Sequence, residues 1–254
     1  MSNKVYLDHH TATRPHPSSI EAMLPFYREH WGSIVSLHHM GRELTLPCEA
    51  ATDSILELCG ASGDHFHFFS SGAEAVAQVY LSHYFDVIRH TGKNHIVTSN
   101  VEEAPILMSL KRLEELDCSG KIVGVNAQGQ ITKEILSEAL RPRTSLVSLS
   151  WANGLTGVIH PIADLAELCK EKGVMLHVDA SYAMGKHYFL FEDLPIDYLT
   201  FEGSLLHAPK GTGGLLYKSK TPFSPPVSHM VGVPVGGVVA LATALERSYL
   251  MFDH

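Results

Sequence analysis

Short apolar runs alternate along the chain with longer segments whose apolar residues recur at helical spacing. The runs are rich in β-branched and aromatic residues and predict strands at 65–69, 95–98, 121–125, 145–151, 174–178 and 196–201. The helical spacing predicts helices at 17–30, 42–58, 70–90, 103–115, 134–140, 161–172 and 236–251. This alternation predicts an α/β fold with three layers, in which helices flank a mostly parallel central sheet.

One domain is expected to include residues 1–254, with residues 1–15 as an N-terminal arm before the first helix. No internal repeat, low-complexity tract or linker interrupts the pattern before the proline-rich segment 221–226. A chain of 254 residues is long enough to bury a sizeable core.

Composition narrows the possible partners and the compartment. The formal net charge of −8 argues against nucleic acid or an anionic membrane as a partner. No signal-peptide core and no apolar run of membrane-spanning length is present in the sequence. The four cysteines lack CxxC spacing and are typical of buried thiols in a reducing compartment, so we expect a cytoplasmic protein.

Seventeen histidines raise the question of a metal site. His65 and His67 share one face of a predicted strand, and 9–10 and 38–39 are adjacent pairs. None of them belongs to an HxxxH, HExxH or Cys/His ligand set, so we expect no metal site.

Two predicted strands end at residues that can bind a ligand. Asp179 directly follows the run 174–178, and open α/β sheets place ligand-binding groups at the carboxyl ends of their strands. The strand 65–69 leads into Ser71 and Gly72 at the start of a helix. Free N–H groups and the helix dipole favour an anion such as phosphate there.

Several segments of the chain resemble motifs of one family. They are VYLDHHTATRP at 5–15, GSIVSLHHMGRE at 32–43, HVDA at 177–180 and PKG at 209–211. They resemble the cysteine desulfurase branch of the class V aminotransferases, fold-type I enzymes that use pyridoxal phosphate. The resemblance implies the fold of that family's large domain and a place among the proteins of iron–sulfur cluster assembly. The family's small C-terminal domain, with its reactive cysteine and substrate-binding arginine, is expected to be absent.

The resemblance also locates the family's catalytic positions, and there the sequence differs. Leu205 replaces the lysine that would form the Schiff base, Ser204 replaces the histidine before it, and Glu103 replaces the ring-stacking histidine. Leucine has no nitrogen to form an imine, so we expect no catalytic residue at this site.

The family's cofactor-binding positions are only partly retained. Those retained are Ser71, Gly72, Ala73 and Asp179, the last of which would pair with the pyridine nitrogen. Those changed are Glu74 for threonine, Gly154 for asparagine, Tyr182 for glutamine and Glu202 for serine. Two unit charges about 4 Å apart repel by roughly 4 kcal/mol at an effective dielectric of about 20. We therefore expect both glutamates to replace the phosphate at the helix N-terminus and no cofactor to bind.

Simple structural roles compete with the functional ones at this site. Ser99 and Glu102 have the spacing of a helix capping box, and Asp179 can cap the turn that follows it. Lys210 and Lys186 could substitute for the missing lysine, but neither stands at its position.

Three hypotheses for function remain. The first is a pseudoenzyme that acts as a binding module and forms a homodimer or a heterodimer with a related desulfurase. We expect apolar surface on the helix at 241–251 to promote this association. The second is a pyridoxal-phosphate enzyme, a desulfurase or aminotransferase, with a non-standard site. The third is a remnant that folds without a selected role.

Overall fold

A seven-stranded sheet forms the centre of the molecule in the computed structural model, which describes residues 5–227 and 232–251. The strands lie in the order β1-β7-β6-β5-β4-β2-β3. Their bounds are β1 His65–Phe69, β2 His95–Ser99, β3 Ser119–Val123, β4 Thr144–Ser150, β5 Met175–Asp179, β6 Tyr198–Glu202 and β7 Gly213–Tyr217. Neighbouring strands are parallel except where β7 pairs with β1 and β6. The predicted, mostly parallel sheet is confirmed.

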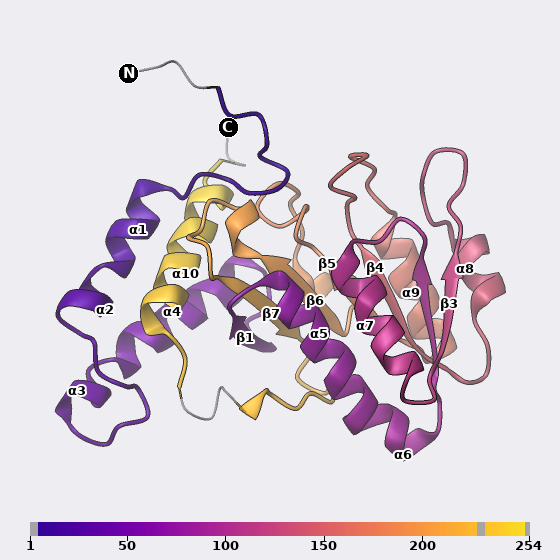
Figure 1. Cartoon of the computed structure of the whole chain (residues 1–254), viewed down its shortest axis with the longest axis horizontal. Helices are drawn as coiled ribbons and strands as arrows, with labels where there is room; N and C mark the ends of the chain where they lie inside the picture. Colours follow the sequence, from indigo (N-terminus) through magenta and orange to yellow (C-terminus); the bar gives the residue numbers. More distant parts are fainter. Residues whose placement is uncertain (1–4, 228–231, 252–254) are drawn as a thin grey trace.

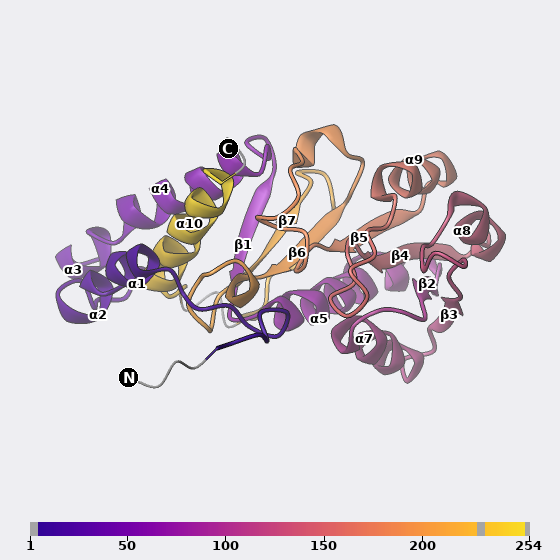
Figure 2. The ribbon, with the colours of Figure 1, turned by 90° about the horizontal axis from the view of Figure 1, so that it is seen from above.

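Helices cover both faces of this sheet (Figure 1). Their bounds are α1 Pro17–Met23, α2 Pro25–Arg28, α3 His39–Arg42, α4 Thr45–Leu58, α5 Gly72–His83, α6 Arg89–Thr91, α7 Ala104–Glu114, α8 Lys133–Ala139, α9 Ile162–Lys172 and α10 Val235–Tyr249. Figure 2 shows α8 and α9 on one face and α5 and α7 on the other, which gives the three predicted layers.

Each face of the sheet has its own apolar core. On one face, α5 and α7 bury Val76, Tyr80 and Ile106 against the strands. On the other face, α4 and α9 bury Ile55 and Leu165. Each such side chain contributes about 1.5–3 kcal/mol when it leaves water. The two cores therefore hold the strand ends, and the groups that those ends carry, in fixed positions.

Two predicted helices at the N-terminal end are shorter than expected. The helix predicted at 17–30 is divided into α1 and α2, because Pro25 has no N–H to continue the ladder of α1. The helix predicted at 42–58 begins at Thr45, after the separate short helix α3.

Two further boundaries differ for local reasons. The helix predicted at 70–90 widens into a π-helical turn at Tyr84–Ile88 before it ends in α6. The strand predicted at 121–125 forms two residues earlier, as β3. It lies at the sheet edge, where pairing of Ser119 with His95 of β2 sets the register in place of the apolar run.

The expectation that the helix at 241–251 leaves apolar surface uncovered is wrong for most of its length. Figure 2 shows α10 between α1 and α4, and both helices contact it. Leu241 and Leu245 of α10 are fully buried. Gly236 allows the close approach to α1, because a Cβ there would lie 3.2 Å from the Met23 side chain, and a Cβ at Gly237 would lie 2.9 Å from the Phe68 ring of β1. Of the large apolar side chains in 241–251, only Leu250 and Met251 at the end are exposed.

Within the described ranges 5–227 and 232–251, no helix combines the length and the apolarity needed to span a bilayer.

Candidate functional site

The carboxyl ends of β1, β2, β4, β5 and β6 lie at one edge of the sheet, since these strands run in the same direction. This is the edge at which open α/β sheets bind ligands. A cavity of about 400 Å³ opens there. Its lining consists of Thr11, Ser70, Ser71, Ala73, Glu103, Pro105, Asp179, Ser181, Tyr182, Glu202, Ser204, Leu205, Lys210 and Gly211. The structure thus brings together most of the site residues predicted from the sequence.

The N-terminus of α5 begins at this cavity and carries a reciprocal cap. Ser71 is the N-cap residue, and its Oγ accepts a hydrogen bond from the Glu74 backbone N–H at 3.1 Å. The Glu74 carboxylate in turn accepts hydrogen bonds from the Ser70 backbone N–H, at 3.0 Å, and from the Ser70 hydroxyl. Glu74 therefore folds back over the turn before the helix.

Glu202 reaches the same helix end from β6. The Gly72 backbone N–H donates a hydrogen bond of 2.7 Å to Glu202 Oε2. The other oxygen, Oε1, accepts from the Ser204 backbone N–H at 3.2 Å and from the Ser204 hydroxyl at 2.7 Å. Both carboxylate oxygens are therefore engaged, one by α5 and one by the 3₁₀ turn Gly203–Leu205.

Glycines allow the backbones around this contact to approach closely. A Cβ at Gly72 would lie 3.0 Å from the Glu202 backbone nitrogen, and one at Gly213 would lie 2.5 Å from the Ser71 carbonyl carbon. One at Gly203 would lie 2.2 Å from the Thr212 hydroxyl. The start of α5, the end of β6 and the start of β7 thus form a tight cradle around the Glu202 carboxylate.

Asp179 ends β5 at the floor of the cavity and is 7% exposed. Its Oδ1 accepts hydrogen bonds from the Ser181 backbone N–H at 3.0 Å and from the Ser181 hydroxyl at 2.6 Å. Asp179 thus caps the turn that follows it, as the sequence predicts. Burial, together with the charges of Glu103 and Glu202, raises the pKa of Asp179 to about 6. The cavity therefore disfavours additional negative charge.

Glu102 has a role that the sequence interpretation missed. Its carboxylate accepts hydrogen bonds from the Ser99 hydroxyl at 2.5 Å and from the Ser150 backbone N–H on β4 at 2.7 Å. Burial raises its pKa to about 7. The capping-box interpretation is wrong, because α7 begins only at Ala104 and has Glu103 as its N-cap. The cross-sheet contact to Ser150 has no signal in the local sequence.

Leu205 stands on the 3₁₀ turn, lines the cavity and is 4% exposed. The neighbouring Ser204 carbonyl accepts two hydrogen bonds from Thr13 in the N-terminal arm, one from the backbone N–H and one from the hydroxyl, both at 2.8 Å. The turn that carries Leu205 is thus held from the arm as well as from α5.

Tyr182 occupies the space beside Gly154. A Cβ at Gly154 would lie 2.1 Å from Cζ of the Tyr182 ring, so the ring excludes any side chain at 154. Burial, followed by the Glu103 and Asp179 charges, raises the pKa of the Tyr182 hydroxyl. Lys186 lies with its Nζ 5.9 Å from the centre of this ring, and burial lowers its pKa.

Lys210 is the one cationic residue in the lining of the 400 Å³ cavity, which also has the carboxylates of Glu103, Asp179 and Glu202. Lys186 is absent from that lining and contacts the Tyr182 ring instead. The structure therefore separates the two candidate amines, and only Lys210 faces the cavity.

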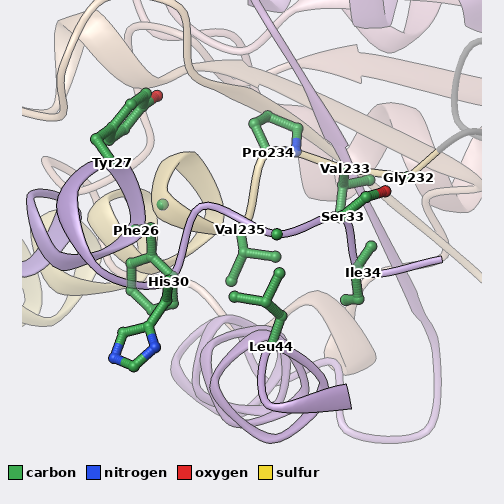
Figure 3. A pocket seen from close by; sticks show the side chains of 12 residues that line it. Phe26, Tyr27, His30, Ser33, Ile34, Leu44, Gly232, Val233, Pro234 and Val235 are labelled. Carbon is green, nitrogen blue, oxygen red and sulfur yellow. The ribbon is translucent and has the colours of Figure 1, made fainter. Parts of the chain in front are cut away.

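Two of the other cavities differ in their relation to this site. One of about 670 Å³ adjoins the first, since Thr11, Glu103 and Tyr182 line both. Another, of about 380 Å³, lies between α2, the loop at 32–34, α4 and residues 232–236 (Figure 3). Apolar side chains such as Ile34, Leu44 and Val235 form its walls, and it shares no lining residue with the site.

The histidines of the described ranges were the candidates for a metal centre. Over the described ranges of the chain, no group of three or more His, Cys, Asp or Glu residues is arranged to hold a metal ion. His65 packs instead against the Tyr217 ring, with centroids 5.0 Å apart.

Strand direction, the helix N-terminus and a strand-end aspartate at one sheet edge define the large domain of a fold-type I protein. The family model Aminotransferase class-V matches residues 5–232, and the chain belongs to this family.

Relatives of the chain include cysteine desulfurases. One from Bradyrhizobium diazoefficiens is 36% identical over 251 residues, which are 95% of this chain and 63% of the relative. One from Cereibacter sphaeroides is 36% identical over 261 residues, which are 99% of this chain and 66% of the relative. The chain thus spans slightly less than two thirds of the length of both. The solved structure of a NifS-like protein superposes with a TM-score of 0.91 at 30% identity, over 98% of this chain and 71% of that chain.

The family depends on pyridoxal phosphate, but the residues present here do not fit that group. The Gly72 N–H that would face its phosphate is bonded to the Glu202 carboxylate. The Tyr182 ring lies against Gly154, and Leu205 offers no amine. Ser71, Ala73 and Asp179 still line the cavity and are the residues that could contact a bound cofactor.

Proposed function

We propose that this cysteine-desulfurase-like protein is a pseudoenzyme that works as a binding module. The observation that carries the proposal is Leu205, a buried aliphatic side chain at the position that corresponds to the family's Schiff-base lysine. Ser204 and Glu103 support it as well. They stand at the positions of the family's two histidines, and neither residue supplies the imidazole ring that a histidine would.

A second candidate is a pyridoxal-phosphate enzyme with a non-standard site, a desulfurase or aminotransferase. The Lys210 amine favours it, because it lines the same cavity as Asp179. Two features oppose it. Lys210 does not stand at the position of the family's Schiff-base lysine, which Leu205 occupies, and the first N–H of α5 is already bonded to Glu202.

A spectral titration tests the proposal. The purified protein is mixed with pyridoxal phosphate, reduced with borohydride and digested for mass spectrometry, and sulfide release from cysteine is measured in parallel. We expect no visible absorbance from an internal aldimine, no pyridoxyl-lysine and no sulfide. A pyridoxyl group on Lys210 would overturn the proposal in favour of the second candidate. A Lys210→Met variant is the matched control for that adduct.

We further propose that the partner is a second copy of this chain or a related desulfurase, and that the protein works in the cytoplasm. Exposed aromatic side chains at Tyr27 and Trp31, 63% and 66% exposed, support an association surface near α2. The four cysteines, all in the described part of the chain, are free and buried, which supports a reducing compartment. Size-exclusion chromatography with light scattering, on the protein alone and after co-expression with a desulfurase of the same cell, tests the partner. A monomer mass in both would contradict it.

A further inference from the structure

We propose that the Glu202 carboxylate is a built-in ligand that occupies the anion-binding position at the N-terminus of α5. The junction between α5, β6 and β7 is then complete without any phosphate-bearing molecule. This inference deepens the proposed function, and it rests on that proposal only in assigning no phosphate-bearing cofactor to the site.

Geometry distinguishes Glu202 from Glu74, although both lie near the helix end. Glu74 belongs to α5 itself, bonds backward to Ser70 and is absent from the cavity lining. Glu202 comes from a different element, 130 residues away in the sequence, and accepts the first N–H of the helix at 2.7 Å. An anion that binds from outside the helix would accept the same N–H group.

The Glu202 carboxylate already holds the Gly72 N–H that a bound anion would use. The backbones beside it are closely packed, since a Cβ at Gly72, Gly203 or Gly213 would lie 2.2–3.0 Å from neighbouring atoms. The second Glu202 oxygen accepts two hydrogen bonds from Ser204, so the carboxylate is held from both sides. A phosphate would have to displace a carboxylate that already has three hydrogen bonds from two elements.

The negative charge of the cavity also disfavours a bound phosphate. Asp179 and Glu103 line the same cavity, and the pKa of Asp179 is already raised by burial and by the charges of Glu103 and Glu202. A phosphate would add negative charge to this group of carboxylates. A carboxylate of the chain itself carries one negative charge, whereas a phosphate dianion carries two. It can therefore accept the N–H group at the helix end with less repulsion from the other carboxylates.

The test measures thermal unfolding of the wild-type protein and of Glu202→Ser, in chloride and in increasing inorganic phosphate at constant ionic strength. We expect the variant to unfold about 3–10 °C below the wild-type protein in chloride, because a charge-assisted hydrogen bond to a buried junction is lost. Phosphate should raise the unfolding temperature of the variant saturably and leave the wild-type protein unchanged. Glu138→Ser changes the net charge equally on an exposed helix surface and is the matched control.

Glu202→Asp keeps the charge but shortens the side chain by one methylene, and it serves if the serine variant does not fold. We expect it to lose the Gly72 contact and to be less stable than the wild-type protein. The inference is overturned if either folded variant is as stable as the wild-type protein. It is equally overturned if Glu202→Ser shows no response to phosphate, or if wild-type protein and variant respond alike. The proposed function rests on Leu205 and not on Glu202, so none of these results decides it. The borohydride experiment tests it separately.

Discussion

Gly154 and Tyr182 form a complementary pair, because the Tyr182 ring occupies the space that a side chain at position 154 would need. A Cβ at Gly154 would lie 2.1 Å from the Tyr182 ring. The sequence shows both substitutions but not their contact, because the two residues lie on different loops at the carboxyl edge. Packing across the site, not local propensity, couples them.

We expect Gly154→Ala to lower the free energy of unfolding by about 1–3 kcal/mol, because the new methyl group must displace the Tyr182 ring. In a Tyr182→Ala background the same substitution should cost little. Urea unfolding of the two single variants and the double variant measures this coupling. Gly124→Ala is the control, since nothing lies within 4 Å of a Cβ built there. Additive costs for Gly154 and Tyr182 would contradict the pairing.

Most elements were predictable from the apolar pattern, and the exceptions have physical causes. Strands β2, β4 and β5 are buried on both faces, so their apolar runs mark them clearly. Edge strand β3 exposes most of its side chains and takes its position from pairing with β2. In the site, Leu205 and Asp179 could be located from motifs. The contacts of Glu102 and Glu202 depend on residues 48 and 130 positions away, which no local pattern reveals.

The burial of α10 by α1 and α4 leads to a prediction about two leucines. Leu241 is fully buried between these helices, whereas Leu250, just after the end of α10, is 56% exposed. We expect Leu241→Ala to lower the free energy of unfolding by about 2–5 kcal/mol. Leu250→Ala should change it by less than about 0.5 kcal/mol. Chemical denaturation of both variants checks the difference, and equal effects would contradict the packing of α10.

Several buried titratable groups make the stability of the whole protein depend on pH. His83 and His177 are completely buried, and burial lowers their pKa from 6.5 to about 4 and about 3. The unfolded chain therefore takes up protons at these residues below pH 6.5, while the folded protein does not. Each histidine costs up to about 3–5 kcal/mol of stability as the pH falls toward its folded pKa.

Glu102 and Asp179 act in the opposite direction. Their folded pKa values, about 7 and about 6, lie above the ordinary 4.5 and 3.8, so the folded protein binds their protons more tightly. The stability that these two carboxyl groups contribute is fully present below their ordinary pKa values. It is lost as the pH rises through their pKa values in the folded protein. Between pH 7 and about 5 the gain from these carboxyl groups offsets the loss from the histidines.

We therefore expect the free energy of unfolding to change little between pH 7 and about 5 and to fall below about pH 4.5, where the contribution of Glu102 is complete and that of Asp179 alone no longer balances the two histidines. Urea unfolding across this range gives the profile. His177→Gln should make the acid limb shallower, and Glu102→Gln should remove part of the compensation above pH 5. An acid limb that is unchanged in His177→Gln would contradict the assignment.

The bond from Gly72 to Glu202 joins residues that are 130 positions apart, and this separation also sets an order of events during synthesis. The ribosome adds about 5–20 residues per second, so the start of α5 is made roughly 7–26 s before Glu202 exists. Throughout that interval the Glu202 carboxylate is not yet available to the first N–H of α5. In the proposed role of Glu202, the carboxylate that completes this helix end is therefore supplied by the chain itself, once translation has reached residue 202.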